Sequence, residues 1–382
     1  MNVVVLGELG TSEPRIPLMP GDAAKLVELG ASLQVEAGIG ARIGFADSAY
    51  TEAGATVSSD RQALLGEADL VLRLGKPSSE DVAAMKKGCI HVSYLDPFNE
   101  TGLVKELQAA GISAISMEMI PRTTLAQKMD ALSSQANLAG YVAVVLAAER
   151  MNRIFPMMMT PSGTIPPAKV FIIGAGVAGL QAIATAKRLG ARVEAFDTRP
   201  VVAEQVESLG GRFVKVDLGE TGQTKDGYAR ELTPEQLEKQ RQTMAKHAAG
   251  ADVVITTAQL FGRPAPRILT RAMVEAMKPG SIVIDMAVET GGNVEGSVPG
   301  EEVDINGVRV MGPRNLPGHA AADASLMYSS NLFNLVEHSW DAEAKALQLK
   351  VEDEIMDGCL VVHDGAIRNE TIKTLIEGKG DE

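Results

Sequence analysis

The sequence predicts an α/β protein built from two Rossmann-like domains, each a doubly wound parallel sheet, with a cleft between them. Three observations predict this class. Short apolar runs rich in β-branched residues alternate with helical repeats, as in parallel sheets covered by helices. A chain of 382 residues exceeds one ordinary hydrophobic core, so two domains are expected. Residues 174–179 place closely spaced glycines between a strand and a helix.

The first domain is predicted to contain residues 1–132 and 322–382. Strands are expected at residues 3–6, 33–36, 70–74, 90–94 and 114–117, and helices at residues 22–29, 81–86 and 102–110. A helix over residues 320–338 is expected to cross back from the second domain, and residues 360–367 indicate a hairpin. This domain has no glycine-rich turn of its own.

The second domain, residues 133–321, is organised around a strand at 170–173 that runs directly into Gly174, Gly176 and Gly179. In this pattern the first glycine permits a tight turn, the second lets a pyrophosphate approach the backbone, and the third allows close helix–strand packing. The following helix would present free N–H groups and a partial positive charge to phosphates. This context favours dinucleotide binding over a non-binding α/β turn.

The choice of cofactor depends on Asp197, which ends the next strand, residues 193–196. A carboxylate here accepts hydrogen bonds from the adenosine ribose and repels a 2′-phosphate, so NAD(H) is favoured over NADP(H). Arg199 lies two residues on and qualifies this prediction, because a nearby arginine can accommodate that phosphate.

Further elements are expected in the same domain. Strands are predicted at residues 212–216, 252–256, 282–285 and 308–311, and a helix at 234–246. Residues 218–233 lack periodicity and indicate a mobile loop, since long loops in compact domains are usually functional or mobile. Residues 155–167, FPMMMTPSGTIPP, predict a hairpin with apolar sides. Such a ribbon needs a partner surface, either its own domain or, as we favour, a second subunit.

Composition excludes several classes. The net charge of −13 argues against nucleic acid or anionic lipid as the main partner. Cys89 and Cys359 lie in separate apolar stretches, which indicates buried thiols in a reducing compartment. No signal peptide is indicated at the N-terminus. No transmembrane helix is expected, because the longest uncharged apolar run identified, residues 170–186, is too short, and a cytoplasmic protein is predicted.

A polar segment leads from the first domain into the second, and it contains Arg122, Gln127, Asp130 and Ser133. One interpretation is a solvated helix start in which Asp130 and the serines act as caps. The other is a ligand-binding segment, because the connection between two domains should line the cleft.

The sequence shows no clear general acid or base. None of its five histidines has a neighbouring carboxylate pattern, no metal-ligand spacing is visible, and the G-x-S-x-G elbow is absent. Interconversion of an alcohol or amine with a carbonyl needs a proton donor and acceptor. Hydride transfer between two nicotinamides needs only orientation and exclusion of water. The sequence therefore favours the second reaction.

The motifs PRTTLAQKMDALSSQANLAGY, FPMMMTPSGTIPPAKVFIIGAGVAGLQAIATAKRLGA, EQVESLGG, GYARE and MKPGSIVIDMAVETGGN resemble the NAD(H)-binding component of proton-translocating nicotinamide nucleotide transhydrogenases. The resemblance implies a cytoplasmic homodimer held at the inner face of the membrane by membrane-spanning subunits, with NADP(H) on a further component. It implies that Arg122, Gln127, Asp130 and Ser133 position the nicotinamide. The expected cofactor contacts also include Gly174, Gly176, Val177, Gly179, Asp197, Thr198, Arg199, Gly227, Tyr228, Gln240 and Gln259.

The chain is also similar to alanine dehydrogenases, which gives an alternative function as an NAD-dependent amino-acid oxidoreductase. Arg15 and Lys76 stand where that family holds pyruvate, but its catalytic histidine and aspartate fall at Asp96 and Glu289. A third hypothesis is an NAD-responsive module without activity. The polar cluster Arg122–Ser133 argues against it, because a sensor need not orient the nicotinamide ring.

Overall fold

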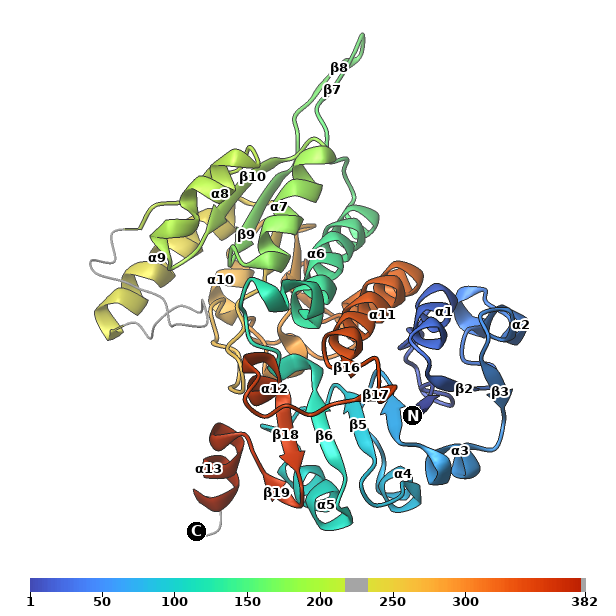
Figure 1. Ribbon diagram of the computed structural model, residues 1–382. Helices are drawn as coiled ribbons and strands as arrows, with labels where there is room; N and C mark the ends of the chain where they lie inside the picture. Colours follow the sequence, from blue (N-terminus) through green and yellow to red (C-terminus); the bar gives the residue numbers. More distant parts are fainter. Residues whose placement is uncertain (217–232, 379–382) are drawn as a thin grey trace. The chain divides into compact units, whose positions relative to one another are not determined.

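The computed structural model describes residues 1–216 and 233–378 and divides into two compact units. Unit 1 comprises Met1–Gln135 and Ala320–Glu382, and unit 2 comprises Ala136–His319. The predicted mobile loop, residues 218–233 with Gly227 and Tyr228, lies outside the described residues apart from Thr233. Each unit is a sheet covered by helices on both faces, so the α/β class is confirmed (Figure 1).

Unit 1 contains an eight-stranded sheet with the order β19-β18-β6-β5-β4-β1-β2-β3. Its strands are β1 (Asn2–Val5), β2 (Ser32–Glu36), β3 (Thr56–Ser58), β4 (Leu70–Leu72), β5 (Ile90–Ser93), β6 (Ser113–Ser116), β18 (Leu360–His363) and β19 (Ala366–Ile367). The strands β1 to β6 run parallel, but β18 pairs antiparallel with both β6 and β19. The first sheet is therefore mixed at this edge, where the predicted hairpin of the tail adds to the parallel strands.

The helices of unit 1 are α1 (Pro20–Glu28), α2 (Asp47–Glu52), α3 (Arg61–Glu67), α4 (Ser79–Ala84), α5 (Thr101–Ala110), α11 (Ala321–His338), α12 (Glu354–Cys359) and α13 (Glu370–Gly378). Unit 1 has a hydrophobic core on each face of its sheet. Side chains of β1 point alternately into the two cores, with Val3 and Val5 in one and Val4 in the other. This alternation is why β1 reads as an unbroken apolar run. The sequence did not reveal α2, β3 and α3, which are too short to establish a period.

Unit 2 contains a seven-stranded sheet with the order β11-β10-β9-β12-β13-β15-β14. Its strands are β9 (Lys169–Ile173), β10 (Arg192–Phe196), β11 (Arg212–Phe213), β12 (Val253–Thr256), β13 (Ile282–Asp285), β14 (Glu302–Ile305) and β15 (Val308–Met311). The strand expected at residues 212–216 is shorter than predicted. The antiparallel strand β14, which was not predicted, closes the sheet at the edge.

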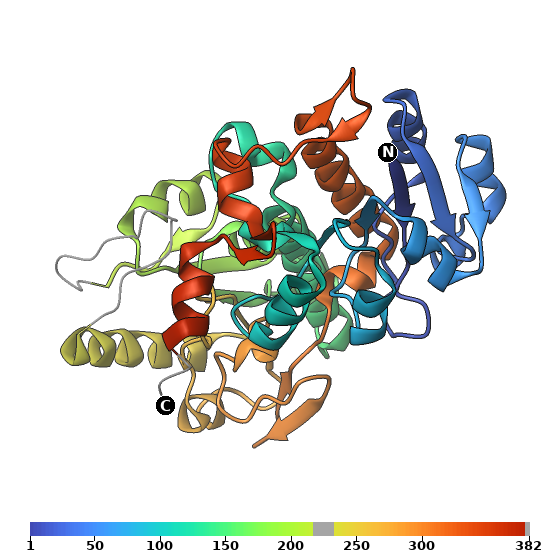
Figure 2. The ribbon, with the colours of Figure 1, turned by 60° about the horizontal axis from the view of Figure 1, so that its bottom comes forward.

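The helices of unit 2 cover both faces of this sheet. They are α6 (Ala131–Arg150), which begins within the last residues of unit 1, α7 (Val177–Arg188), α8 (Ala203–Ser208), α9 (Pro234–Gly250) and α10 (Arg271–Glu275). Val170 and Ile172 of β9 pack with α6, α7 and α8, whereas Phe171 and Ile173 pack with α9 and α10. The helices α9 and α10 lie side by side (Figure 2).

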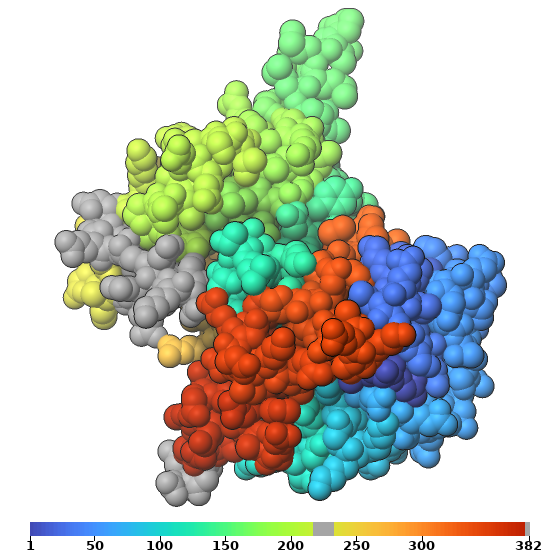
Figure 3. Space-filling model, viewed as in Figure 1, coloured from blue at the N-terminus to red at the C-terminus, as the bar shows by residue number. Residues whose placement is uncertain are grey.

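Short 3₁₀ helices connect several of these elements: η1 (Ala41–Ile43), η2 (Met117–Met119), η3 (Leu125–Met129), η4 (Pro200–Val202), η5 (Val288–Thr290) and η6 (Leu316–Ala320). Two small ribbons stand apart from the sheets. One pairs β16 (Trp340–Asp341) with β17 (Ala346–Leu347). The other pairs β7 (Met158–Thr160) with β8 (Gly163–Ile165) in the segment predicted to be a hairpin, and it projects from the rest of unit 2 (Figures 1 and 3).

The helix α6 is long and apolar enough to cross a membrane by length and composition. The prediction from sequence missed this segment, because it took residues 170–186 as the longest candidate run. Core helices of globular proteins pass the same test, and Ala143, Val144 and Ala147 of α6 lie in the core of unit 2. We interpret α6 as a packing helix.

In each sheet the first parallel strand lies inside the sheet. The next strands along the chain are added on one side of it, and the later parallel strands are added on the other side. In unit 1 the reversal lies between β1 and β4, and in unit 2 between β9 and β12. Ligands of doubly wound folds bind outside the carboxyl ends of the strands at such a reversal. A ligand site is therefore expected at the two reversal points.

Candidate functional site

The turn after β9 requires glycine at two of its three positions. Gly174 has a φ of +100°, and a Cβ built there would lie 2.4 Å from Thr257 Oγ1. A Cβ on Gly179 would lie 1.9 Å from the carbonyl oxygen of Gly174. The first glycine therefore permits the turn and the third lets α7 pack on it, which are the roles the sequence assigned to them.

Gly176 differs from its neighbours, because a Cβ built there meets no atom within 4 Å. It is the N-cap of α7, and no side chain caps this helix. The first N–H groups of a helix have no intrahelical acceptor and carry the positive end of the helix dipole. Open space beside these donors fits the pyrophosphate of a dinucleotide. Val177, the first residue of α7, is 39% exposed at this end.

Asp197 lies at the carboxyl end of β10 and its carboxylate is already engaged. It accepts the N–H of Ala175 at 2.8 Å and a bidentate pair from Arg199, with Nε and Nη2 each at 2.9 Å. The side chains of Asp197 and Arg199 are 7% and 17% exposed. A ribose hydroxyl bound at Asp197 would have to replace a contact with Arg199. Thr198, between them, is half-buried.

The loop after β12 forms the other side of the reversal point and is held by a buried amide. Asn293 accepts the N–H of Ala258 at 3.1 Å and donates to the carbonyl oxygens of Ala258 and Pro266, both at 2.8 Å. Asp285 in turn accepts the N–H groups of Asn293 and Val294. Sequence reasoning missed this pair, although the segment IVIDMAVETGGN contains both residues. A buried strand ending in a carboxylate was the available signal.

The remaining predicted contacts of unit 2 are dispersed. Gln259 is exposed, and its amide donates to the carbonyl oxygen of Met286 at 3.4 Å. Gln240 of α9 is buried, and its Oε1 has no hydrogen-bond partner within residues 1–216 and 233–378. Gly227 and Tyr228 lie outside the described residues.

In unit 1, the polar segment divides into two kinds of side chain. Arg122 and Gln127 are exposed, with Gln127 in η3. Asp130 precedes α6 and caps it, since its carboxylate accepts the N–H of Ser133 at 2.8 Å and the hydroxyl of Ser133 at 2.5 Å. The capping interpretation of Asp130 is therefore confirmed. A cap of this kind also fixes where Asp130 and Ser133 lie.

Asp96 and Glu289, which the resemblance placed at acid–base positions of alanine dehydrogenases, are both exposed. Asp96 adopts a φ of 51°, accepts the amide of Asn99 at 2.8 Å, and donates its own N–H to Glu118. Burial raises the pKa of Glu118, against the hydrogen bonds that it accepts from Ser116 and the backbone of residues 95 and 96. Glu289 accepts the N–H of Asn315 at 3.1 Å.

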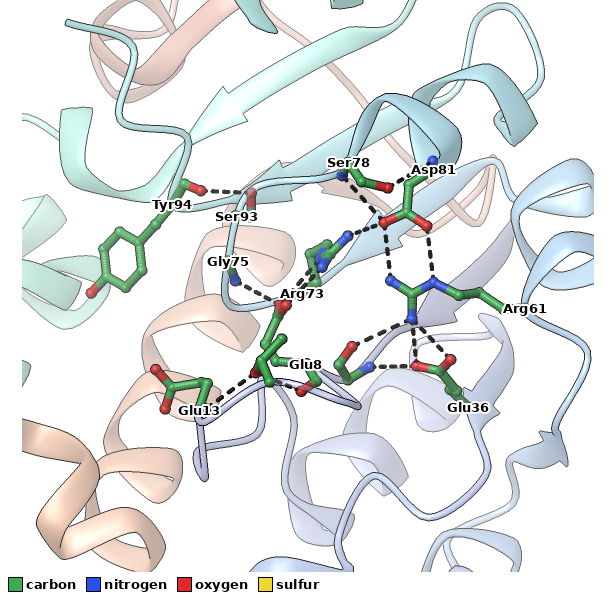
Figure 4. A network of polar contacts seen from close by, with 12 residues as sticks. Glu8, Glu13, Glu36, Arg61, Arg73, Gly75, Ser78, Asp81, Ser93 and Tyr94 are labelled. Atoms are coloured by element: carbon green, nitrogen blue, oxygen red, sulfur yellow. Dashed lines mark hydrogen bonds and ion pairs between the residues drawn. The ribbon is translucent and has the colours of Figure 1, made fainter. Parts of the chain in front are cut away.

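The reversal point of unit 1 is occupied by its own charged side chains (Figure 4). Arg73 donates to Glu8 at 2.7 Å and to Asp81 at 2.6 Å. Arg61 donates to the same Asp81 at 2.9 Å and to Glu36 at 2.8 Å. Burial alone raises the pKa of Asp81, but the hydrogen bonds and charges of both arginines hold it well below its usual range.

Glu36 ends β2 as Asp197 ends β10, and the two carboxylates act on the backbone in the same way. Glu36 accepts the N–H of Gly7 at 2.9 Å, and Asp197 accepts that of Ala175 at 2.8 Å. Among the described residues of unit 1, however, no glycine turn of this pattern leads into a helix, and Glu8 and Glu36 are paired with Arg73 and Arg61 (Figure 4). The dinucleotide-binding features are thus found in unit 2.

Arg15 and Lys76, the candidate pyruvate ligands, both pair with carboxylates of unit 1. Arg15 binds Glu13, and Lys76 binds Glu100. Within the described ranges no three His, Cys, Asp or Glu side chains gather to hold a metal ion. Burial raises the pKa of Cys89 and of Cys359 to about 12, and both are free thiols, as predicted.

Comparison with known proteins places these features in context. Residues 4–139 and 143–370 match the N-terminal and C-terminal domains of the family "Alanine dehydrogenase/PNT". The chain is 44% identical over 374 residues to the first part of NAD(P) transhydrogenase subunit alpha from Rhodospirillum rubrum, covering 96% of this chain and 97% of that one. The crystal structure of transhydrogenase from Sinorhizobium meliloti matches with a TM-score of 0.86 at 42% identity, covering 96% of this chain and 100% of that one. The alanine dehydrogenase of Halomonas elongata is 29% identical over 394 residues, covering 100% and 98% of the two chains.

Proposed function

The chain belongs to the alanine dehydrogenase/PNT family, and we propose that it is the NAD(H)-binding component of a proton-translocating nicotinamide nucleotide transhydrogenase. NADH, when bound, would supply the hydride that passes to NADP⁺ on a partner component and would leave as NAD⁺. The observation that carries cofactor binding is the open space at Gly176, beside a helix N-terminus that no side chain caps. Similarity to transhydrogenases over nearly the whole chain supports the reaction.

On this proposal, each portion of unit 2 has a defined task. The N–H groups at the start of α7 bind the pyrophosphate, and Gly176 leaves the room for it. Asp197 holds Ala175 in place. Arg199 is paired with Asp197, so the pair carries no net charge and offers a 2′-phosphate little attraction. Asn293 fixes the loop that contains Ala258 and Gln259.

In unit 1, we assign the positioning of the nicotinamide to Arg122, Gln127, Asp130 and Ser133. Arg122 and Gln127 have the exposed polar groups that such contacts require. Asp130 and Ser133 are held by mutual hydrogen bonds, so their remaining oxygen lone pairs have a defined direction. Hydride transfer between nicotinamides moves no proton at the reacting carbons, so orientation and exclusion of water suffice.

An alanine dehydrogenase activity is the second candidate, because that family shares the fold and contributes a relative at 29% identity. Two points support the first candidate. On the resemblance, the acid–base positions fall at Asp96 and Glu289, and Arg15 and Lys76 are already paired with carboxylates. A non-enzymatic sensor would have no use for the ordered segment at Asp130.

We also propose that the chain forms a homodimer through the β7–β8 ribbon. Met157, Met158 and Met159 are 58%, 45% and 73% exposed, and Ile165 is 43% exposed. A two-stranded ribbon with such sides is marginal alone and is stabilised by burial against another surface (Figure 3). A second copy of the chain is the partner we favour. Sedimentation of the Met158→Ser/Met159→Ser variant should then show monomers at concentrations where the parent is dimeric.

Attachment to the membrane would come from other subunits of the complex, since we interpret the long apolar helix α6 as a member of the core of unit 2. The chain itself would be cytoplasmic and would lie at the inner face of the cell membrane. The proton path would belong to membrane-spanning partners.

The decisive assay follows deuterium from [4-²H]NADH. The purified chain is mixed with the NADP(H)-binding component, and label in NADPH is measured by mass spectrometry, with pyruvate plus ammonium as the competing acceptor. Label in NADPH supports direct transfer, whereas label in alanine at ordinary dehydrogenase rates establishes the alternative. A sensor would bind NADH and transfer nothing.

Gln127→Asn separates orientation from binding in the same assay. If Gln127 positions the ring, this variant should lose most hydride transfer while its NADH affinity stays close to that of the parent. Gln242→Asn is the matched control, because Gln242 is exposed on α9 and bonds to Glu238 of its own helix.

A further inference from the structure

Arg15 has a bonding pattern that differs from that of a substrate ligand. Its Nε and Nη2 donate to the two carboxylate oxygens of Glu13, each at 2.8 Å, and its Nη1 donates to Gln135 Oε1 at 2.7 Å. The Nε–Nη2 edge is one that can bind a carboxylate in bidentate fashion. Glu13 occupies that edge, and the two side chains are only 11% and 19% exposed. The charge of Arg15 is therefore balanced inside unit 1.

Gln135 connects this pair to the start of α6 and to α11. Its side chain is 6% exposed, and while Oε1 accepts from Arg15, Nε2 donates to the carbonyl oxygen of Ala324 at 3.0 Å. The backbone N–H of Ile16 donates to Ser325 Oγ at 2.9 Å, so the backbone next to Arg15 is also attached to α11. Both ends of the Gln135 amide are thus used.

The segment before Gln135 is tied to α11 by a second link. Ser134 donates its hydroxyl to Asn331 Oδ1 at 2.7 Å, and Asn331 Nδ2 donates to the carbonyl oxygen of Lys128 at 2.9 Å. Lys128 lies between the proposed nicotinamide contacts Gln127 and Asp130. The backbone of residues 128–135 therefore has two attachments, through Gln135 and through Asn331.

From this geometry we infer that Arg15 is a positioning residue, which acts through Gln135 to hold the first turn of α6 where Asp130 and Ser133 contact the nicotinamide. This inference rests on the proposed function for what those two residues do. Its physical basis is that hydride transfer depends on the alignment of reacting carbons within a fraction of an ångström. Binding of the whole dinucleotide, which has many other contacts, depends on that alignment much less.

The test compares Arg15→Lys, Gln135→Leu and the double variant in the labelled-hydride assay. Lysine keeps a positive charge beside Glu13. Its ammonium group cannot reproduce the planar guanidinium, which donates to both oxygens of Glu13 and also to Gln135. We expect each single change to lower the transfer rate roughly tenfold while the NADH dissociation constant changes less than about threefold. Because both act through one contact, the double variant should be no slower than the slower single variant. The inference would be overturned if the rate losses of the two single variants multiplied in the double variant. It would also be overturned if NADH affinity fell as much as the transfer rate.

Gln135→Glu adds a discriminating comparison. A carboxylate at this position can still accept from Arg15 but cannot donate to Ala324, so it should transfer hydride faster than Gln135→Leu. Arg271→Lys is the matched control for the arginine change, since Arg271 is 57% exposed and pairs with Glu275 on its own helix. Equal rates for the glutamate and leucine variants would contradict a role through the Arg15 contact.

Hydrogen exchange separates failure of this inference from failure of the proposed function. In Arg15→Lys, the amides of Ser133 and Ser134 should exchange roughly tenfold faster, while amides of β1 keep their protection. This readout needs no turnover. If the parent chain transfers no hydride to NADP⁺, the proposed function fails, and unchanged exchange at Ser133 and Ser134 would refute the positioning role independently.

Discussion

Replacing Gly176 by alanine should separate folding from cofactor binding. A Cβ built at this position meets no atom within 4 Å, and the backbone has φ −80° and ψ −166°, which an alanine adopts without strain. Alanine also reduces the freedom of the unfolded chain. Alanine is less favourable than glycine at an N-cap, which opposes this gain, so we expect the free energy of unfolding to change by less than about 1 kcal/mol.

The same methyl group should weaken binding of NADH. It would occupy the space beside the uncapped start of α7, where we place the pyrophosphate. A hydrogen bond to a charged group contributes about 1.5–3 kcal/mol, so loss of one such bond raises the dissociation constant roughly 10- to 150-fold. Urea denaturation measures stability, and NADH fluorescence titration measures affinity.

Gly250→Ala is the control, because a Cβ there also meets nothing within 4 Å and Gly250 ends α9. It should match the parent in affinity. A Gly176→Ala protein that binds NADH as tightly as the parent would refute the placement of the pyrophosphate, and one that fails to fold would refute the description of the turn.

Three further predictions concern stability. Gly179→Ala places a Cβ 1.9 Å from a backbone oxygen, so overpacking should cost about 3 kcal/mol or more in urea denaturation, in contrast to Gly176→Ala. Asp285→Asn replaces one oxygen of a buried carboxylate by an NH₂ group, so at least one of the three backbone N–H groups that Asp285 accepts loses its acceptor, and the free energy of unfolding should fall by about 1–3 kcal/mol, whereas Asp304→Asn at an exposed site should change it little. Burial, with a smaller contribution from Arg73, lowers the pKa of His91 to about 3 from the ordinary 6.5. The unfolded chain therefore binds this proton first as pH falls below 6.5, and about 2 kcal/mol should be lost between pH 7.5 and 5.0. His91→Gln should lack that loss, and equal pH slopes in the two proteins would contradict the prediction.

The sequence alone determined the features of this protein that depend on neighbouring residues. The strand, glycine turn, helix and second strand around Gly174–Gly179 are confirmed, because apolar periodicity and glycine at a strained φ are properties of a short segment. The capping role of Asp130 was equally accessible, since its partner Ser133 lies three residues away. Family resemblance extended this reading to the whole chain.

Other features depended on contacts between distant residues, and only the tertiary structure decided them. The pairing of β18 with β6 joins residues far apart in the chain and makes the first sheet mixed. Asp285 and Asn293 showed their role only when the loop at Ala258 was seen beside them. Short elements such as α2 and β3 contain too few residues to show a period, and packing against the sheet stabilises them.

Arg15 shows the physical reason most clearly. From sequence it could be a pyruvate ligand, because its identity and position match that role in alanine dehydrogenases. Its charge and donors are the same in either case, and what differs is which acceptors the fold brings to it. Glu13 is a local neighbour, but Gln135 comes from the start of α6, 120 residues away. Local sequence determines what a side chain can bind, and the tertiary structure determines which partner it does bind.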